Sequence, residues 1–102
     1  MAEKDGGIKG RVKEKLDQLD EEETSRRFGE LNIVSDVADS SDGAVKIKFS
    51  PLSPYSPTAV NIGRKIRAAA LSVEGVTSVS VECVGHMMDE LVNRLVNEKQ
   101  PD

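Results

Sequence analysis

With 102 residues, of which 31% are charged and 3% aromatic, and a net charge of −4, the chain has room for one domain with one modest core. The acidic balance and the scarcity of aromatic side chains exclude a typical nucleic-acid binder, which needs clustered Lys and Arg with stacking platforms. No stretch approaches the about 18 apolar residues of a membrane helix, so we expect a single soluble, cytoplasmic domain over residues 1–102, flexible at 1–7 and 99–102.

A helical stripe opens the sequence. The apolar side chains of Ile8, Val12, Leu16 and Leu19 recur at spacings of four, four and three residues. This spacing places them on one face of an amphipathic helix. We expect the acidic run at residues 20–23 to mark the end of that helix or a break before residues 26–31.

A β-hairpin is predicted in the middle of the chain. Ile33, Val34 and Val37 lie in a β-prone segment, and residues 40–43 read Ser-Ser-Asp-Gly, which is typical of a tight turn. After the turn, apolar side chains at 45, 47 and 49 alternate with lysines at 46 and 48. Because successive side chains of a strand point to opposite faces, the lysines face water and the apolar side chains face the core.

A proline-rich loop and a helix follow the hairpin. Three prolines between residues 51 and 57 exclude both a helix and a central strand there. Ser56 followed by Pro57 favours a helix start, since Ser is a preferred N-cap and proline fits the first helical position. The apolar side chains that share one face of this helix are Ala59, Ile62, Ile66, Ala69, Ala70 and Val73.

The last third of the chain predicts a strand and a final helix. Gly75 ends the preceding helix, and residues 77–83 alternate apolar and polar side chains, as in a half-buried strand. Asp89 and Glu90 favour the first turn of an amphipathic helix. Its apolar side chains, which we expect in the core, are Met87, Met88, Leu91, Val92, Leu95 and Val96. Together the elements predict an α+β fold, a small two-layer domain in which a three-stranded sheet, the hairpin plus a third strand, packs with two to three helices.

The sequence offers little for catalysis or metal binding. Cys83 is the only cysteine, which excludes an intramolecular disulfide and fits a reducing compartment. It shares a strand face with Val79 and Val81, so we interpret it as a buried small hydrophobe. His86, the only histidine, stands just before the last helix, where it is interpreted as a boundary residue or polar cap. We predict no catalytic residues, no metal site and no cofactor.

The segment from Ser53 to Thr58 is the better candidate for binding. A helix N-terminus carries unpaired backbone N–H groups and the positive end of the helix dipole, where an anion can bind. Ser53, Tyr55, Ser56 and Thr58 place hydroxyl groups beside it, and we predict these four as ligand-binding or partner-binding residues. The alternative is that Ser56 only caps the helix and the prolines only stiffen the turn.

A small basic cluster lies on the helix that follows this loop. Arg64, Lys65 and Arg67 are most simply a solvated helix face. They also form a basic patch that can attract an acidic partner.

The succession of hairpin, proline loop, helix and strand resembles the iron–sulfur cluster assembly domain of the SufT and PaaD type over about residues 31–84. In that family Pro-x-Cys-Pro opens the helix, and Pro54-Tyr55-Ser56-Pro57 stands at the matching place, so Ser56 replaces the family's cysteine. The rhythm from Gly75 to Glu82 matches the family's helix exit and last strand. A serine hydroxyl is a far poorer soft-metal ligand than a thiolate. The resemblance implies an accessory or adaptor factor in the maturation of iron–sulfur proteins.

Two functions of different classes follow. The first is a non-catalytic adaptor that binds a protein partner, an iron–sulfur maturation factor or client, through the Ser53 to Thr58 loop and the last helix. The second is a sensor of small anions or ligands that uses the helix N-terminus at Ser56. A hydrolase or thiol enzyme is disfavoured, because no base lies at a recognisable spacing from Cys83 or any serine. A homodimer through the broad apolar face of the last helix is left open.

Overall fold

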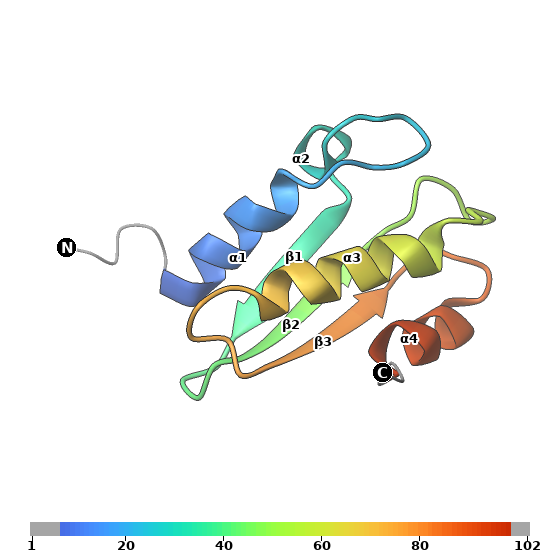
Figure 1. Cartoon of the computed structure of the whole chain (residues 1–102). Helices are drawn as coiled ribbons and strands as arrows, with labels where there is room; N and C mark the ends of the chain where they lie inside the picture. The colour runs from blue at the N-terminus through green and yellow to red at the C-terminus, as the bar shows by residue number, and fades with distance from the viewer. Residues whose placement is uncertain (1–6, 99–102) are drawn as a thin grey trace.

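The computed structural model describes residues 7–98, which form four helices and one sheet (Figure 1). In chain order the elements are α1 (Gly7–Asp17), α2 (Phe28–Leu31), β1 (Val34–Asp39), β2 (Ala44–Phe49), α3 (Ala59–Leu71), β3 (Ser78–Cys83) and α4 (Asp89–Asn97). This order confirms the α+β prediction and adds the four-residue helix α2. The ends predicted to be flexible, 1–7 and 99–102, lie outside the described residues, except that Gly7 begins α1.

The three strands form one mixed sheet in the order β1-β2-β3. β1 and β2 are the predicted hairpin; they pair antiparallel with Val37 opposite Ile47, and the register shifts between Val34 and Asp36. β3 runs parallel to β2 and places Val81 beside Ile47. A parallel neighbour cannot be reached through a tight turn, so α3 forms the crossover between β2 and β3.

The helices cover one face and one edge of the sheet (Figure 1). α1 lies against β1 and α3, α3 packs on β3, and α4 lies beside both α3 and β3. The alternation along β2 buries Ile47 and Phe49 beneath the helices and leaves Lys46 and Lys48 exposed on the uncovered face. The domain is therefore two-layered, as predicted from its sequence. The 13-residue α3 is too short to cross a bilayer, and no helix within residues 7–98 is a candidate span.

The core consists of aliphatic side chains and the two phenylalanines. Val12 and Leu16 are fully buried, so the first helix packs into the domain with the face that its sequence pattern predicts. The strands contribute their inward side chains, and α3 and α4 contribute one face each. The buried apolar residues are Val12, Leu16, Phe28, Ile33, Val34, Val37, Val45, Ile47, Phe49, Ala59, Ile62, Ile66, Ala70, Val79, Val81, Cys83, Val92 and Val96.

Gly43 closes the hairpin turn in a conformation that other residues rarely adopt, with φ at 90°. A Cβ atom there would lie 2.5 Å from the carbonyl oxygen of Gly75. The turn is joined to the segment before β3, because Thr77 donates from N to the Gly43 oxygen at 2.9 Å and from Oγ1 to the Asp42 oxygen at 2.9 Å. The Asp-Gly turn read from the sequence thus also fixes the entry to β3.

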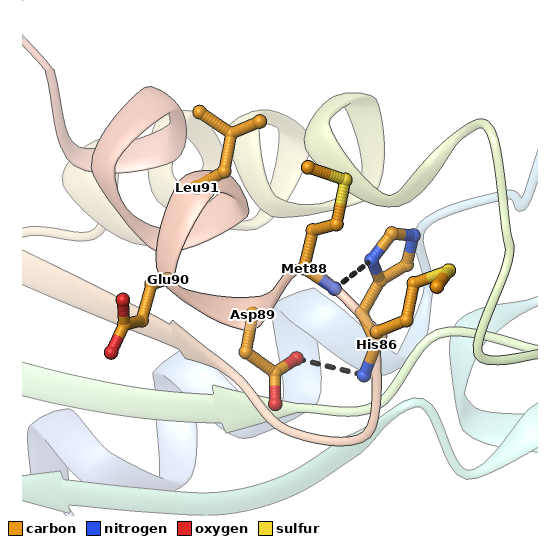
Figure 2. Close-up of a pocket in the computed structure, with 6 residues that line it drawn as sticks. His86, Met88, Asp89, Glu90 and Leu91 are labelled. Atoms are coloured by element: carbon orange, nitrogen blue, oxygen red, sulfur yellow. Dashed lines mark hydrogen bonds between the residues drawn. The ribbon is translucent and has the colours of Figure 1, made fainter.

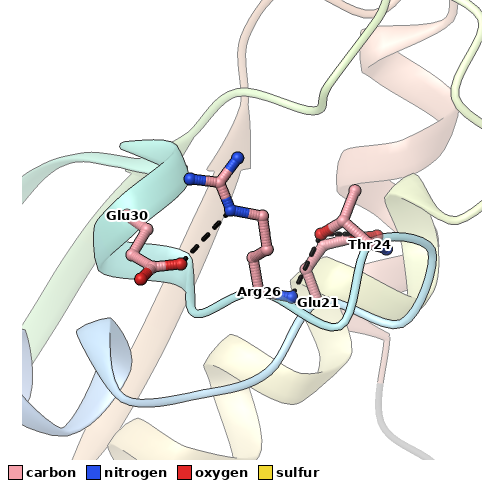
Figure 3. A network of polar contacts seen from close by, with 4 residues as sticks. All are labelled: Glu21, Thr24, Arg26 and Glu30. Atoms are coloured by element: carbon pink, nitrogen blue, oxygen red, sulfur yellow. Dashed lines mark hydrogen bonds and ion pairs between the residues drawn. The ribbon is translucent and has the colours of Figure 1, made fainter.

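The loop between α1 and α2 is held by polar contacts (Figure 3). Glu21 is fully buried, and its Oε1 accepts hydrogen bonds from Thr24 N at 2.8 Å and from Thr24 Oγ1 at 2.9 Å. Next to it, Arg26 Nε donates to Glu30 Oε1 at 3.3 Å. These hydrogen bonds hold the loop in a defined conformation, which its acidic sequence does not predict.

Candidate functional site

The four predicted binding residues lie on the loop between β2 and α3, but they are not equally accessible. The Tyr55 side chain is 71% exposed, whereas Ser56 is 3% exposed. Ser53 shapes the turn, since its Oγ accepts from Tyr55 N at 3.3 Å and its carbonyl oxygen accepts from Ser56 N at 3.2 Å. Ser56 Oγ and Thr58 Oγ1 share a hydrogen bond of 3.2 Å. Of the four, Tyr55 is therefore the one most available to a partner.

The predicted helix start at Ser56 is wrong. α3 begins at Ala59, Thr58 occupies the cap position, and no side chain caps the helix. The reason is that Ser56 is already engaged: its N–H closes the turn with Ser53, its hydroxyl bonds Thr58, and its carbonyl oxygen contacts His86. The alternative that Ser56 only caps the helix is wrong for the same reason.

His86 joins this loop to the loop between β3 and α4. Its Nε2 lies 3.0 Å from the Ser56 carbonyl oxygen, and its Nδ1 accepts from Met88 N at 3.1 Å (Figure 2). Since the Met88 N–H can only donate, Nδ1 carries no proton and Nε2–H donates to Ser56. Both ring nitrogens are thus occupied in holding two loops together, which extends the interpretation of His86 as a boundary residue.

Asp89 fixes the same loop from the first position of α4. Its carboxylate accepts hydrogen bonds from His86 N at 2.7 Å (Figure 2) and from Gly85 N at 3.2 Å. Burial by itself would raise the pKa of this carboxyl, but the backbone donors, together with the Cys83 thiol and the nearby His86, hold it below its ordinary value. The carboxylate therefore remains charged at neutral pH and anchors the loop.

Cys83 lies at the end of β3 and is 1% exposed, as its strand pattern predicts. Burial raises the pKa of its thiol to about 12, and the hydrogen bond to the Asp89 carboxylate with that group's negative charge adds to the effect. A buried thiol that stays protonated at neutral pH is a poor nucleophile. Within residues 7–98 no three His, Cys, Asp or Glu side chains gather to hold a metal ion.

Exposed apolar side chains gather where the two loops meet. Met87 N donates to the carbonyl oxygen of Pro54 at 2.9 Å, which sets the loop after β3 against the loop after β2. Met87 and Met88 are 65% and 51% exposed and precede α4, so their predicted place in the core is wrong. We call the exposed large apolar side chains of these two loops the loop patch; they are Leu52, Tyr55, Val84, Met87 and Met88. Beside it lies a shallow hollow of about 450 Å³, lined by His86, Met87, Met88, Asp89, Glu90 and Leu91.

Sequence reasoning found one half of this site and missed the other. The hydroxyl groups of the β2–α3 loop predict a binding site there, whereas the structure distinguishes this loop by its exposed apolar residues Leu52 and Tyr55. Met87 and Met88 continue the helical spacing of α4, which made them resemble core residues. The available signal was Asp89, because an acidic residue in a first turn places both methionines before the helix.

Comparison with known proteins supports the family resemblance. Residues 9–82 match the iron–sulfur cluster assembly protein family, a region that includes α1 and the loop after it as well as most of residues 31–84. An uncharacterised protein of Methanocaldococcus jannaschii is 31% identical over 71 residues, which cover 70% of this chain and 75% of that protein. The crystal structure of the domain of unknown function DUF59 from Bacillus anthracis superposes with a TM-score of 0.71 at 19% identity, covering 78% of this chain and 76% of that chain.

The structural likeness shows that the two folds agree, and the sequence match carries the relationship further. It spans well over half of the chain, from the first helix through the hairpin and α3 into β3. The chain belongs to the iron–sulfur cluster assembly protein family.

Proposed function

We propose that this protein is a non-catalytic adaptor in the maturation of iron–sulfur proteins, and that it binds a protein partner through the loop patch. The observation that carries the proposal is that two neighbouring loops hold five of the six large exposed apolar side chains found within residues 7–98. Contiguous exposed apolar surface is typical of interaction sites, and Tyr and Met are enriched there. The partner expected from the family is a maturation factor or a client protein.

The loops that carry the patch are held in place, which favours binding. The contacts of His86 with Ser56 and Met88, and of Met87 with Pro54, fix one loop against the other. Such a surface loses little conformational entropy when a partner docks. More of the free energy gained from apolar contact therefore contributes to affinity.

A role without catalysis is supported by the state of the two residues best suited to chemistry. Both ring nitrogens of His86 are engaged in structural hydrogen bonds, and the raised pKa of Cys83 keeps its thiol protonated. Ser56, which stands where the resemblance places the family's cysteine, is buried. We therefore propose that the cluster is cargo of the partner and is not bound by this chain.

The anion sensor at Ser56 has less support. Its hydroxyl is 3.2 Å from Thr58 Oγ1 and is buried, so it does not face solvent. The α3 N-terminus remains, but the residues meant to recognise an anion there are engaged with one another. The adaptor is the function that the geometry favours.

Affinity capture with the tagged full chain tests the adaptor. The wild-type chain should enrich iron–sulfur proteins or their maturation factors, identified by mass spectrometry, and the variant Tyr55→Ser/Met87→Ser should lose them. Lys46→Ser/Lys48→Ser is the control, because both lysines are exposed on the uncovered face of the sheet, away from the loop patch. Equal enrichment by the patch variant and the wild type would contradict the proposal, as would equal losses in both variants.

Anaerobic reconstitution with iron and sulfide tests the absence of a bound cluster. We expect no stable visible absorption band. A band that persists after desalting and disappears in Cys83→Ala would show that the chain itself holds the cluster.

A further inference from the structure

A second surface lies in a groove between α3 and α4, apart from the loop patch. The groove has a volume of about 290 Å³ and combines an apolar floor with two arginines. It contains Leu71, the one large exposed apolar side chain of residues 7–98 that is outside the loop patch. Its lining residues are Arg64, Arg67, Ala68, Leu71 and Val96.

The groove exists because α4 approaches α3 closely at Gly63. A Cβ atom on Gly63 would lie 2.5 Å from Val96 Cγ2, so only glycine permits this contact. Val96, 2% exposed, forms the floor, while the exposed Ala68 and the partly exposed Leu71 form the wall on α3. A side chain that entered the groove would thus meet apolar atoms on both helices.

Arg64 and Arg67 lie three residues apart on α3 and therefore project from the same side of the helix. Within residues 7–98 neither arginine side chain has a hydrogen-bond or ion-pair partner, and the Nε of Arg67 is buried. Other basic groups are engaged: Lys65 Nζ, between them in sequence, donates to the Asp20 oxygen at 2.8 Å, and Lys13 pairs with Asp17 at 2.7 Å. The guanidinium groups of Arg64 and Arg67 are therefore available to an external anion.

We propose that this groove binds an acidic segment of a partner protein, with one aliphatic side chain of the segment in the groove and its flanking carboxylates on Arg64 and Arg67. Guanidinium groups bind carboxylates through paired, charge-assisted hydrogen bonds, which would also use the donor capacity of the desolvated Arg67. The volume is at the lower limit of pockets for small molecules, so it suits a single side chain better than a cofactor.

Two other occupants fit the surface less well. Nucleic acid would have to approach a chain of net charge −4 at a groove without an aromatic platform. A second copy placed by a twofold axis would bring the same two arginines against each other, and like charges repel. An acidic segment with an aliphatic side chain is complementary both to the two arginines and to the apolar floor.

Fluorescence anisotropy with synthetic peptides tests the proposal on the full chain. The probe is a capped, labelled peptide with one leucine between glutamates, compared with a version in which serine replaces the leucine and a version in which lysines replace the glutamates. We expect the wild-type chain to bind the first peptide most tightly. Arg64→Gln/Arg67→Gln should weaken that binding by about tenfold or more.

The matched control is Lys46→Gln/Lys48→Gln, which removes the same amount of charge from the uncovered sheet face and should leave binding unchanged. Ala68→Glu, at an exposed helical position, should abolish binding by adding a carboxylate to the groove wall four residues after Arg64, without touching the core. Circular dichroism and thermal melting of each variant establish that it is folded.

Four outcomes would overturn the proposal. If the arginine double variant and the lysine double variant weakened peptide binding equally, the loss would follow from the change in net charge and not from the groove. If the leucine and serine peptides bound equally tightly, the apolar floor would not contribute to peptide binding. Tighter binding of a labelled single-stranded oligonucleotide, lost in Arg64→Gln/Arg67→Gln, would assign the groove to nucleic acid. Concentration-dependent dimerisation lost in Ala68→Glu would assign it to a second copy. The loop patch is a separate surface, so the variant Tyr55→Ser/Met87→Ser should bind the acidic peptide as tightly as the wild type. Failure of one proposal can thus be told apart from failure of the other.

Discussion

The side-chain amide of Asn97 pairs with the backbone of Val81 as a neighbouring strand would: Val81 N donates to Asn97 Oδ1 at 2.8 Å, and Asn97 Nδ2 donates to the Val81 oxygen at 2.7 Å. One turn earlier on α4, Asn93 Oδ1 accepts a hydrogen bond from Cys83 N. The outer edge of β3 is thereby satisfied by a helix, and an edge that could pair with another chain is closed.

Replacing Asn97 by alanine should destabilise the domain by about 2 kcal/mol, because the Val81 N–H and C=O then lack partners in a partly buried position. Urea unfolding measures the change. Asn61→Ala on the exposed face of α3 is the control, since it gains the same helix propensity and no hydrogen bond is recorded for its side chain. Equal stability of the two variants would contradict a structural role for the Asn97 pair.

Cys83 should give stability a dependence on alkaline pH. Its pKa is raised from 9.0 to about 12 in the folded state, so folding favours the protonated thiol. That contribution is complete below the pKa of the unfolded chain and is lost as pH rises from about 9 towards 12. The unfolding midpoint of the wild type should fall across this range more steeply than that of Cys83→Ala, which lacks the group.

The same thiol should react with a disulfide reagent at pH 8 only after unfolding, since the thiolate is the reactive form and Cys83 is buried. Reaction in native buffer at the rate seen in denaturant would show that the thiol is accessible and ionised.

The contribution of Asp89 to the stability of the fold should be largest at pH values above the range in which carboxylates become protonated. Its folded-state pKa is lowered, so the stability it contributes is present above its ordinary value of 3.8 and is lost as pH falls through the folded value. Asp89→Asn should cost about 1 kcal/mol at pH 7, and the gap to the wild type should narrow below pH of about 4. Glu90→Gln, the next residue in the same first turn, should cost only a few tenths of that. A gap that is constant with pH would contradict the charge as its source.

Gly63→Ala should destabilise the domain although alanine is the better helix former. The added Cβ would meet Val96 Cγ2 at 2.5 Å, and such overpacking costs about 1–3 kcal/mol, against a propensity gain of about 1 kcal/mol. Val96→Ala in the same chain should recover part of the loss, because it vacates the space. A double-mutant cycle by thermal or urea unfolding measures this coupling, and strict additivity would contradict direct contact.

Much of the fold is predictable because it depends on local patterns. The alternation of Val45, Ile47 and Phe49 with lysines, and the helical spacing of Val12 and Leu16, each specify an element and its buried face without knowledge of neighbours. The burial of Cys83 follows from the same rule. Local patterns fail where a motif can make contacts other than the expected one. Ser-Pro is a common helix start, but Ser56 instead forms hydrogen bonds with Ser53, Thr58 and His86.

The candidate site was only half visible, because its parts come from different stretches of chain. His86 Nε2 and the Ser56 oxygen are separated by 30 residues in sequence and by 3.0 Å in space. Nothing in residues 84–88 alone indicates that Met87 will contact Pro54. Periodicity places Met87 and Met88 on the apolar face of α4 because it cannot show where the helix begins.

The sequence by itself determined the elements, their inward faces and the family resemblance, because these depend on residue types at fixed local spacing. The tertiary structure decided that β3 runs parallel beside β2, which brings the ends of both strands to one side of the domain and gathers the loop patch there. It also decided that α4 lies against α3 at Gly63 and along β3 through Asn97, which leaves Arg64 and Arg67 beside a groove. Contacts between distant segments arise from packing the core as a whole, and no local pattern contains them.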